Sequence, residues 1–227
     1  MSATNRGSER QADDFYSTPF WCVNRFLEAW PLHAYAKCYD PCVGSGAIVK
    51  AVNAYQPVGS WTGGDIVNRV PNDGQLLQTW LEEDFLKKTP PKFHEYASVI
   101  MTNPPFSLAE EFIKHSLKFA HDVIVLLRVN FLGSKSRRSW LLSTQPNVYV
   151  LPDRPIFARS KKTGKLSSDA TEYAWFHFNA RGKLSGQWTI LNETSKEDRD
   201  RAKQDIIDAE NRSAKPYVPL DPEQVPF

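Results

Sequence analysis

The sequence predicts an α/β fold with a mostly parallel sheet and flanking helices. Through the first 130 residues, short apolar segments alternate with segments of helical periodicity, as in chains whose parallel strands are joined by right-handed crossovers. The segment 122–129 is the most apolar strand candidate and is continuous enough to be buried on both faces. After residue 147 the candidate strands follow one another without helices, which favours a meander or an antiparallel edge.

The elements are expected in the following order. The segment 19–30 has apolar residues at helical spacing and a proline at the helix start. Next come a strand ending at 38–40, a helix over 45–55, a strand over 60–66, an ambiguous segment over 75–86, a strand over 97–102, a helix over 107–120 and the strand 122–129. Ser107 is expected to cap its helix, with Glu110 as capping-box partner.

The last third of the chain differs in character. Strands are expected over 147–151, 173–178 and 187–191, and a solvated helix over 193–211. Four prolines after residue 213 predict an extended or disordered tail. We therefore expect one domain over 1–192, frayed at 1–12, followed by a charged helix and a proline-rich tail over 193–227.

Composition narrows the class of protein. The chain has 227 residues, of which 41% are hydrophobic and 24% charged, enough for one sizeable core. No apolar run approaches the roughly 20 residues of a membrane span, and no targeting or lipidation signal is visible, so a cytoplasmic location without membrane partners is expected. Three cysteines give no disulfide framework and no zinc-finger spacing, so no metal is expected.

A glycine loop lies between the first expected strand and the next helix, in the segment Asp40-Pro-Cys-Val-Gly44-Ser-Gly46. Two glycines permit a sharp turn and close approach of a ligand to the helix N-terminus. The dinucleotide fingerprint is incomplete, because Val49 occupies the position of its third glycine. A tight turn without a ligand is the alternative interpretation of this loop.

Two acids follow the loop in the order typical of nucleotide-binding folds. Asp65 ends the second expected strand, where doubly wound folds place a carboxylate for ribose hydroxyls. Asp84 precedes Phe85, so a carboxylate for an adenine amino group and a ring for the adenine face are adjacent. Taken singly, either acid could be a surface or capping residue.

The most specific feature is Asn103-Pro104-Pro105-Phe106, directly after the strand 97–102. Two prolines fix the backbone, so the Asn103 side chain and the Pro104 carbonyl are held at the carboxyl edge of the sheet. Two rigid acceptors suit a ring-conjugated NH2 group, because accepting both protons returns the nitrogen lone pair for attack. Phe106 could stack on that ring; a stiffened loop with an aromatic plug is the alternative.

At this point the chain resembles the S-adenosylmethionine-dependent amino-methyltransferases, most closely the phage and plasmid type DNA adenine-N6 methyltransferases. The resemblance covers about residues 13–180. It rests on four segments: Asp14-Phe-Tyr-Ser-Thr-Pro19, Asp40 to Gly46, Asn103 to Phe106, and Arg154-Pro-Ile-Phe157 followed by Asp169 and Tyr173-Ala-Trp-Phe176.

The resemblance implies a Rossmann-like methyltransferase fold with a seven-stranded, mostly parallel sheet that contains one antiparallel strand. It implies transfer of a methyl group from S-adenosylmethionine to the N6 amino group of adenine in DNA, with S-adenosylhomocysteine as product and no protein nucleophile. The implied cofactor residues are Phe15, Tyr16, Thr18, Pro19, Asp40, Gly44, Gly46, Asp65, Asp84 and Phe85. The implied catalytic residues are Asn103, Pro104, Pro105 and Phe106. If phage-encoded, the protein would act in the bacterial host cytoplasm.

Sequence specificity is expected to be short or relaxed. Only 56 residues separate Gly46 from Asn103, and the expected strands and helices take up most of them. Little length remains there for a target-recognition segment of the kind that highly specific family members carry, so a compact recognition element would lie in 131–170 or in the C-terminal part.

Charge is unevenly distributed, although the net charge is only +2. The stretch 128–165 holds nine bases and one acid, and the rest of the chain sums to −6. Expected nucleic-acid contacts are Lys135, Arg137, Arg138, Arg154, Arg159, Lys161, Lys162 and Lys165. In a duplex substrate, the target base would be extruded into the Phe106 pocket.

Two alternatives remain open at the level of sequence. The same chemistry could act on RNA adenine or on a glutamine side chain of a protein, because a turn of this type serves any planar NH2 group. A nucleic-acid-binding module could instead retain the fold without turnover.

Overall fold

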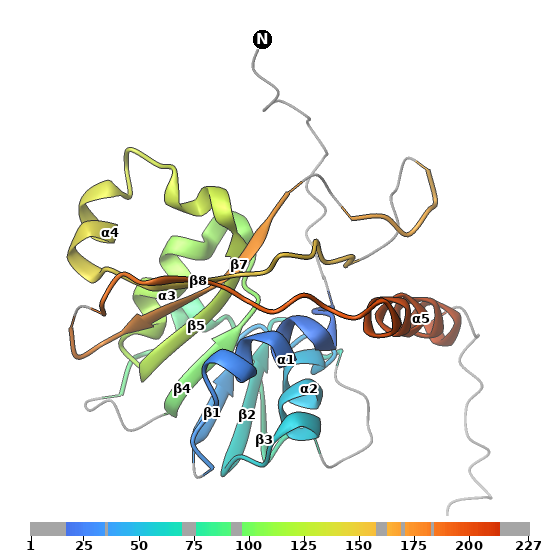
Figure 1. Cartoon of the computed structure of the whole chain (residues 1–227). Coiled ribbons are helices and arrows are strands. Elements are labelled where there is room, and N and C mark those ends of the chain that lie inside the picture. The colour runs from blue at the N-terminus through green and yellow to red at the C-terminus, as the bar shows by residue number, and fades with distance from the viewer. Residues whose placement is uncertain are drawn as a thin grey trace, which may run out of the picture.

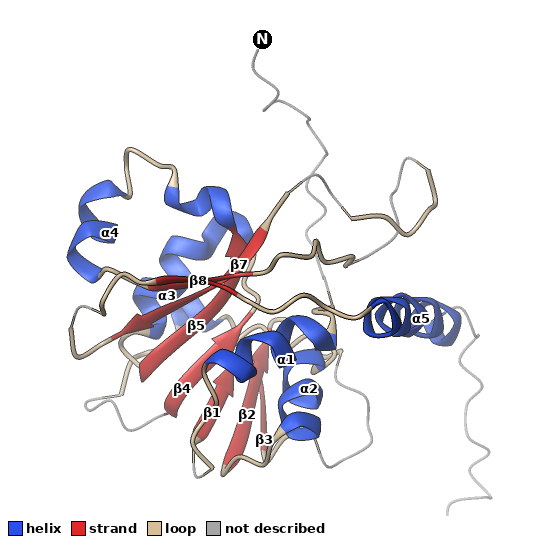
Figure 2. Cartoon of the chain, viewed as in Figure 1, coloured by secondary structure: helices blue, strands red, loops and turns tan. Residues whose placement is uncertain are grey.

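The computed structural model describes residues 17–34, 36–69, 76–91, 97–157, 163–168, 171–182 and 184–213. Within these residues the chain forms a three-layer α/β sandwich, with helices on both faces of a twisted sheet (Figure 1; Figure 2). The proline-rich tail expected after residue 213 lies outside the described residues.

The sheet has eight strands in the order β3-β2-β1-β4-β5-β7-β6-β8. Their bounds are β1 Lys37–Asp40, β2 Ser60–Asp65, β3 Thr79–Glu82, β4 Ala97–Thr102, β5 Ala120–Arg128, β6 Asn147–Val150, β7 Tyr173–Asn179 and β8 Trp188–Ile190. Strand β7 is antiparallel to both of its neighbours, and every other pairing is parallel.

The α/β class, the mostly parallel sheet and the single antiparallel strand are confirmed. The expected number of strands is wrong, because the short edge strand β8 brings the total to eight. After residue 147 a meander or an antiparallel edge was expected: the antiparallel pairing is confirmed for β6 and β7, but the meander is wrong. Strand β7 inserts between β5 and β6, and β8 then pairs in parallel with β6.

Helices cover the two faces of the sheet separately. The elements α1 (Phe20–Ala29), α2 (Ala47–Tyr55) and α5 (Lys196–Ser213) contribute to the core on one face. The other face carries η1 (Phe85–Lys87), α3 (Ala109–Ser116), η3 (Val129–Leu132) and α4 (Arg138–Thr144). A short η2 (Phe106–Leu108) precedes α3.

Strand β5 is the centre of both cores. Ile124 and Leu126 pack toward α1 and α2, whereas Val123 and Val125 pack toward α3. Successive side chains of a strand point to opposite faces, so a strand covered on both sides must be apolar throughout. The prediction of a doubly buried strand is confirmed, with its start two residues earlier than expected.

Two local expectations for the helices are wrong. Ser107 does not cap a helix: η2 follows the two prolines, and Leu108 is the N-cap of α3 without a side-chain bond. Helix α4 was not expected from the sequence. It has only seven residues, and its apolar residues Trp140, Leu141 and Leu142 are consecutive, so the sequence does not show the helical spacing by which an amphipathic helix is recognised.

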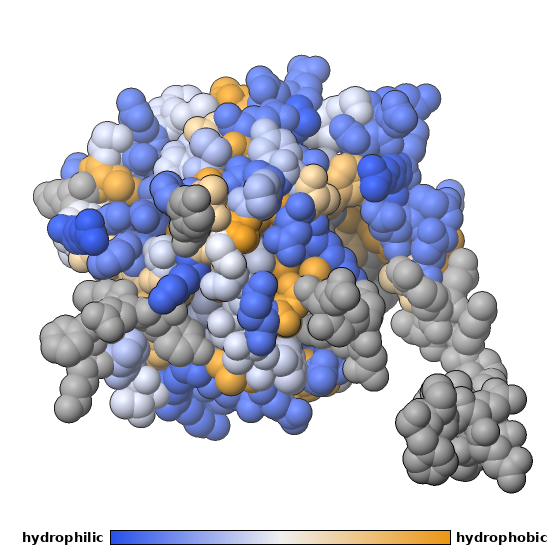
Figure 3. Space-filling model, turned by 90° about the horizontal axis from the view of Figure 1, so that it is seen from below, coloured by the Kyte–Doolittle hydropathy of each residue, from blue (hydrophilic) through white to orange (hydrophobic). Residues whose placement is uncertain are grey.

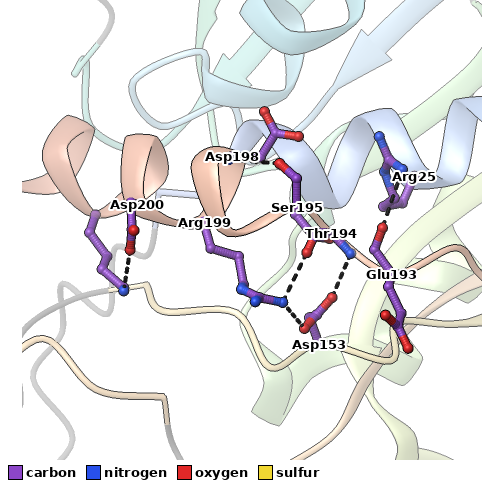
Figure 4. Close-up of polar contacts among 9 residues, drawn as sticks. Arg25, Asp153, Glu193, Thr194, Ser195, Asp198, Arg199 and Asp200 are labelled. Carbon is purple, nitrogen blue, oxygen red and sulfur yellow. Dashed lines mark hydrogen bonds and ion pairs between the residues drawn. The ribbon is translucent and has the colours of Figure 1, made fainter.

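The C-terminal helix is tied to the domain by a polar cluster (Figure 4). Asp153 accepts hydrogen bonds from the Thr194 amide (2.7 Å) and from the Arg199 guanidinium. Ser195 Oγ accepts from the Asp198 amide at 3.0 Å and so caps the first turn. Arg201 lies 4.8 Å from the centre of the Phe20 ring of α1. The charged helix therefore packs onto α1, although most of its surface is solvated as expected.

The surface is polar over much of its area. Hydrophilic side chains cover most of the face seen in Figure 3, where the apolar patches are small and separate. Within the described residues, no helix is both long and apolar enough to cross a membrane.

Candidate active site

The predicted site residues gather at one edge of the sheet. Strands β1, β2, β4 and β5 are mutually parallel, so their carboxyl ends meet there. Asp40 ends β1, Asp65 ends β2 and Asn103 directly follows β4. The fold thus brings together a glycine loop, two carboxylates and the Asn-Pro-Pro-Phe turn, which the sequence separates by up to 66 residues.

Asp40 is a buried carboxyl group with one orphaned oxygen. The side chain is 1% exposed, and its Oδ1 accepts from the Cys42 amide at 3.1 Å. Within the described residues, Oδ2 has no ordinary hydrogen-bond partner. Burial raises the Asp40 pKa to about 7, opposed by the nearby Thr102 hydroxyl and the Cys42 amide and reinforced by the Asp65 charge. A ligand that donates hydrogen bonds or carries positive charge would satisfy this oxygen.

The glycine loop depends on left-handed backbone at two positions. Gly44 has φ +51° and Gly46 has φ +76°, a region that residues with a Cβ rarely adopt. The Gly44 amide donates to Asp65 Oδ2 at 2.9 Å, so the loop is anchored on the carboxylate expected to bind ribose. A Cβ at Gly46 would lie 2.2 Å from Leu76 Cδ2, because the Leu76 side chain packs closely against this glycine.

The predicted adenine contacts need correction. Phe85 is 2% exposed and packs against Tyr39, Phe112 and Phe119, so neither face of its ring is open to a ligand. Asp84 caps η1 by accepting from the Leu86 amide, and it pairs with Lys87 at 3.0 Å. Phe85 belongs to the core under α3, so the prediction of a stacking ring is wrong. Asp84 is a partly exposed capping acid, and its contact with the adenine stays a prediction.

The Asn-Pro-Pro-Phe turn contacts the N-terminal segment. Asn103 Nδ2 donates to Thr18 Oγ1 at 3.2 Å, and Thr18 is 5% exposed. Thr18 belongs to a segment expected to bind the cofactor, and the next residue, Pro19, is buried as the N-cap of α1. A buried hydroxyl 85 residues away in sequence thus holds the nitrogen end of the Asn103 amide.

An aromatic group lies next to that turn. The Phe106 ring centre lies 5.8 Å from that of Tyr173, whose ring in turn lies 5.1 Å from Phe157. The Arg128 guanidinium, at the end of β5, lies 5.2 Å from the Phe106 ring centre. Its Nε donates to the Tyr173 hydroxyl at 3.4 Å. The fold therefore brings the turn together with the segments 154–157 and 173–176.

Sequence reasoning gave Arg128 no role other than its charge. Its position next to the end of the most apolar expected strand, 122–129, was the available signal, because a charged residue near the end of a doubly buried strand must emerge at the sheet edge. Thr102 was also overlooked, although it directly precedes Asn103. It is fully buried beside Asp40.

The protein residues expected to contact nucleic acid differ in their exposure and in their partners. Lys135, Arg138 and Lys165 are exposed. The Arg137 guanidinium lies 4.5 Å from the Phe131 ring, and its Nε donates to the Phe131 carbonyl. Arg154 pairs with Glu172, so part of its charge is compensated. The predictions for six residues fall outside the described part of the chain: Phe15, Tyr16, Asp169, Arg159, Lys161 and Lys162.

Comparison with known proteins identifies the fold. No family model and no curated protein sequence matches the chain. A type I restriction-modification methyltransferase subunit of Streptococcus thermophilus is similar in structure (TM-score 0.56, 14% identity), covering 85% of this chain and 52% of its own. The chain thus spans about half the length of that subunit.

Two further solved structures are similar. A Listeria monocytogenes protein assigned to the class I S-adenosylmethionine-dependent methyltransferases has a TM-score of 0.54 and 10% identity, over 87% of this chain and 72% of its own. A Pyrococcus horikoshii protein assigned as an RNA methyltransferase has a TM-score of 0.53 and 10% identity, over 76% and 87%. At such identities the likeness concerns the fold, which is the Rossmann-like methyltransferase fold.

Proposed function

We propose that this protein transfers a methyl group from S-adenosylmethionine to the N6 amino group of adenine in DNA, with short or relaxed sequence specificity. The observation that carries the proposal is the Asn103–Phe106 turn at the sheet edge, with Asn103 hydrogen-bonded to Thr18 and Phe106 beside Tyr173. The fold supports a methyltransferase, and the turn favours a planar NH2 group as acceptor.

The residues present fit the cofactor at one observed point. Among the described residues, the buried Asp40 Oδ2 has no hydrogen-bond partner of ordinary geometry, and it would accept from the ammonium group at the methionine end of the cofactor. Gly44 and Gly46 permit close approach of the backbone, and Asp65 lies next to them on β2. When bound, S-adenosylmethionine supplies an electrophilic methyl group on its sulfonium sulfur.

The acceptor side follows from the turn. In this proposal the nitrogen end of the Asn103 amide donates to Thr18, and its oxygen end accepts from a substrate amino group. That oxygen and the Pro104 carbonyl accept hydrogen bonds from the two N–H bonds of the amino group. These hydrogen bonds turn the nitrogen toward tetrahedral geometry and direct its lone pair at the methyl group. Phe106 stacks on the base. One amino proton is released to water, because an amide oxygen is too weak a base to keep it.

No side-chain nucleophile is required in this mechanism. The nearest thiol is that of Cys42, beside Asp40. Burial, together with the charges of Asp40 and Asp65, raises the pKa of Cys42 well above its usual value. The Cys42 thiol therefore stays protonated at neutral pH, and a protonated thiol is a poor nucleophile.

Methylation of DNA is tested directly with labelled cofactor. Unmodified DNA incubated with the protein and methyl-labelled S-adenosylmethionine is expected to yield labelled N6-methyladenine on nucleoside analysis. Equal amounts of RNA and of protein serve as competing substrates. Label found only in RNA or on glutamine would refute the DNA assignment, and no label in any substrate would refute the enzymatic function.

The Thr18 contact leads to a second test. Thr18→Val keeps the shape of the side chain but leaves the Asn103 nitrogen without its acceptor. Loss of one buried hydrogen bond corresponds to about 1–3 kcal/mol, so we expect kcat to fall roughly 5- to 100-fold. Cofactor Kd should stay within about threefold, and Thr18→Ser should restore kcat. If Kd rises while kcat is unchanged, Thr18 contacts the cofactor and does not position Asn103.

A further inference from the structure

A shallow groove of about 660 Å³ lies between α4 and the last strand of the sheet. One side is formed by the loop that leads into α4 and by α4 itself. The other side is β6 with β8. The described residues that line it are Leu132, Ser134, Lys135, Arg138, Leu141, Leu142, Gln145, Pro146, Val148, Gly186 and Trp188. Two of them are cations and none is an acid.

The floor of the groove is an uncovered part of the sheet. Val148 packs in the core on the α3 side and pairs with Trp188 of β8, so both side chains point to that face. Ile190 lies two residues further on the same face. Trp188 is 71% exposed and Ile190 62%, because the short α4 does not extend over β8. An indole ring is thereby presented to solvent beside two positive charges.

One end of the groove is continuous in sequence with the strand that ends at the candidate active site. The segment 132–138 follows directly on η3 and β5, the strand whose last residue, Arg128, contacts Phe106. The turn of the acceptor site follows β4, which lies four strand spacings from β8 in the sheet order, a distance of about 19 Å. A stacked strand rises about 3.4 Å per nucleotide, so roughly six nucleotides bridge the acceptor site and Trp188.

We propose that this groove binds the single nucleic-acid strand that flanks the target base, with Trp188 stacking on a base about six nucleotides away and Lys135 and Arg138 contacting phosphates. Cations without acids favour a polyanion, and an exposed aromatic ring is a stacking platform that accepts any base. This inference rests on the proposed function, because it extends the substrate of that site.

The experiment measures binding and needs no turnover. Fluorescence anisotropy of labelled single-stranded oligonucleotides of 2 to 12 nucleotides is recorded for the wild type and for Trp188→Ala. The wild-type affinity should rise with length and level off once the strand reaches the groove. Trp188→Ala should bind the longer strands about tenfold more weakly and the shortest ones equally well, whereas Trp188→Phe keeps most of the affinity. Because the Trp188 side chain is exposed, we expect the variants to fold, and a thermal melt checks this.

The phosphate contacts have their own readout. Lys135→Ala/Arg138→Ala should reduce the slope of log K against log salt by about 1.4, or about 0.7 per lost single-strand contact. Lys37→Ala/Lys50→Ala removes the same charge from exposed residues of β1 and α2 and should not change the slope by more than general screening does.

The proposal is overturned if Trp188→Ala leaves binding unchanged at every length. It is equally overturned if the variant abolishes a dimer seen by light scattering without altering nucleic-acid affinity, because the groove would then be an interface between copies of the chain. A wild type that binds oligonucleotides through Trp188 but never methylates them would refute the proposed function and leave the groove assignment standing.

Discussion

Asn103→Ala is expected to lower kcat/KM for methyl transfer by about 10³-fold. The substitution removes the acceptor that draws an amino proton away from the reacting nitrogen, and removal of one such preorganised group costs about 10²–10³ in other enzymes. It also leaves the buried Thr18 hydroxyl without its partner. Cofactor affinity, measured by calorimetry, should change by less than about threefold, because Asp40 and the glycine loop remain intact.

A graded series separates this role from a structural one. Asn103→Asp keeps an oxygen acceptor, so it should retain more activity than the alanine variant. Asn192→Ala is the matched control, since Asn192 is an exposed amide that donates to Glu28 and lies outside the site. An Asn103→Ala variant that folds, binds cofactor and turns over at the wild-type rate would exclude the proposed acceptor role.

Much of this edge could be predicted because it rests on local patterns. Strand β4 and the turn after it are defined by an apolar run followed by two prolines, and the dihedral restriction of proline does not depend on the rest of the fold. The glycine loop was predicted for the same reason, since only glycine adopts φ +51° and +76° readily. Local chemistry also predicted the α/β class.

Contacts between distant segments could not be predicted in this way. The Thr18–Asn103 bond joins residues 85 apart, and no periodicity specifies that pair. Phe85 was assigned to a ligand because an acid precedes it, but tertiary packing decides, and α3 covers its ring. Helix α4 escaped prediction because it has only seven residues and its apolar residues are consecutive in sequence. Trp188 of β8 is left exposed.

Asp40→Asn should make the fold more resistant to rising pH. The Asp40 pKa is about 7 in the folded chain against 3.8 for the free group, and burial is the main cause. The folded state therefore holds a proton between these values that the unfolded state has released. The contribution of Asp40 to the free energy of unfolding falls by about 4 kcal/mol in total as pH rises from about 4 to 7. Below and above this range the contribution does not change with pH. Asparagine carries no such proton, so the difference in unfolding free energy between variant and wild type should shift by that amount across the window.

Urea unfolding at several pH values between 4 and 8 measures this difference. Asp205→Asn, which removes an exposed carboxylate from α5, controls for the change in net charge. Other carboxylates titrate in both proteins and cancel in the comparison. A difference that does not vary with pH would show that Asp40 is already ionised in the folded chain.

The same carboxyl group should make cofactor binding release a proton. A cationic amino group beside Asp40 Oδ2 favours the charged form, so binding lowers the pKa that burial had raised. Affinity should then rise with pH, by up to tenfold per unit, and level off above about 7.

Calorimetry at pH 6 in buffers of different ionisation enthalpy counts the released proton. For Asp40→Asn we expect no release from this position and an affinity roughly 10- to 150-fold weaker, the cost of one hydrogen bond to a charged group. Stability and binding thus oppose each other at Asp40: the charge that destabilises the empty fold at neutral pH is the one the ligand requires. If the variant releases as many protons as the wild type, the ammonium group binds elsewhere.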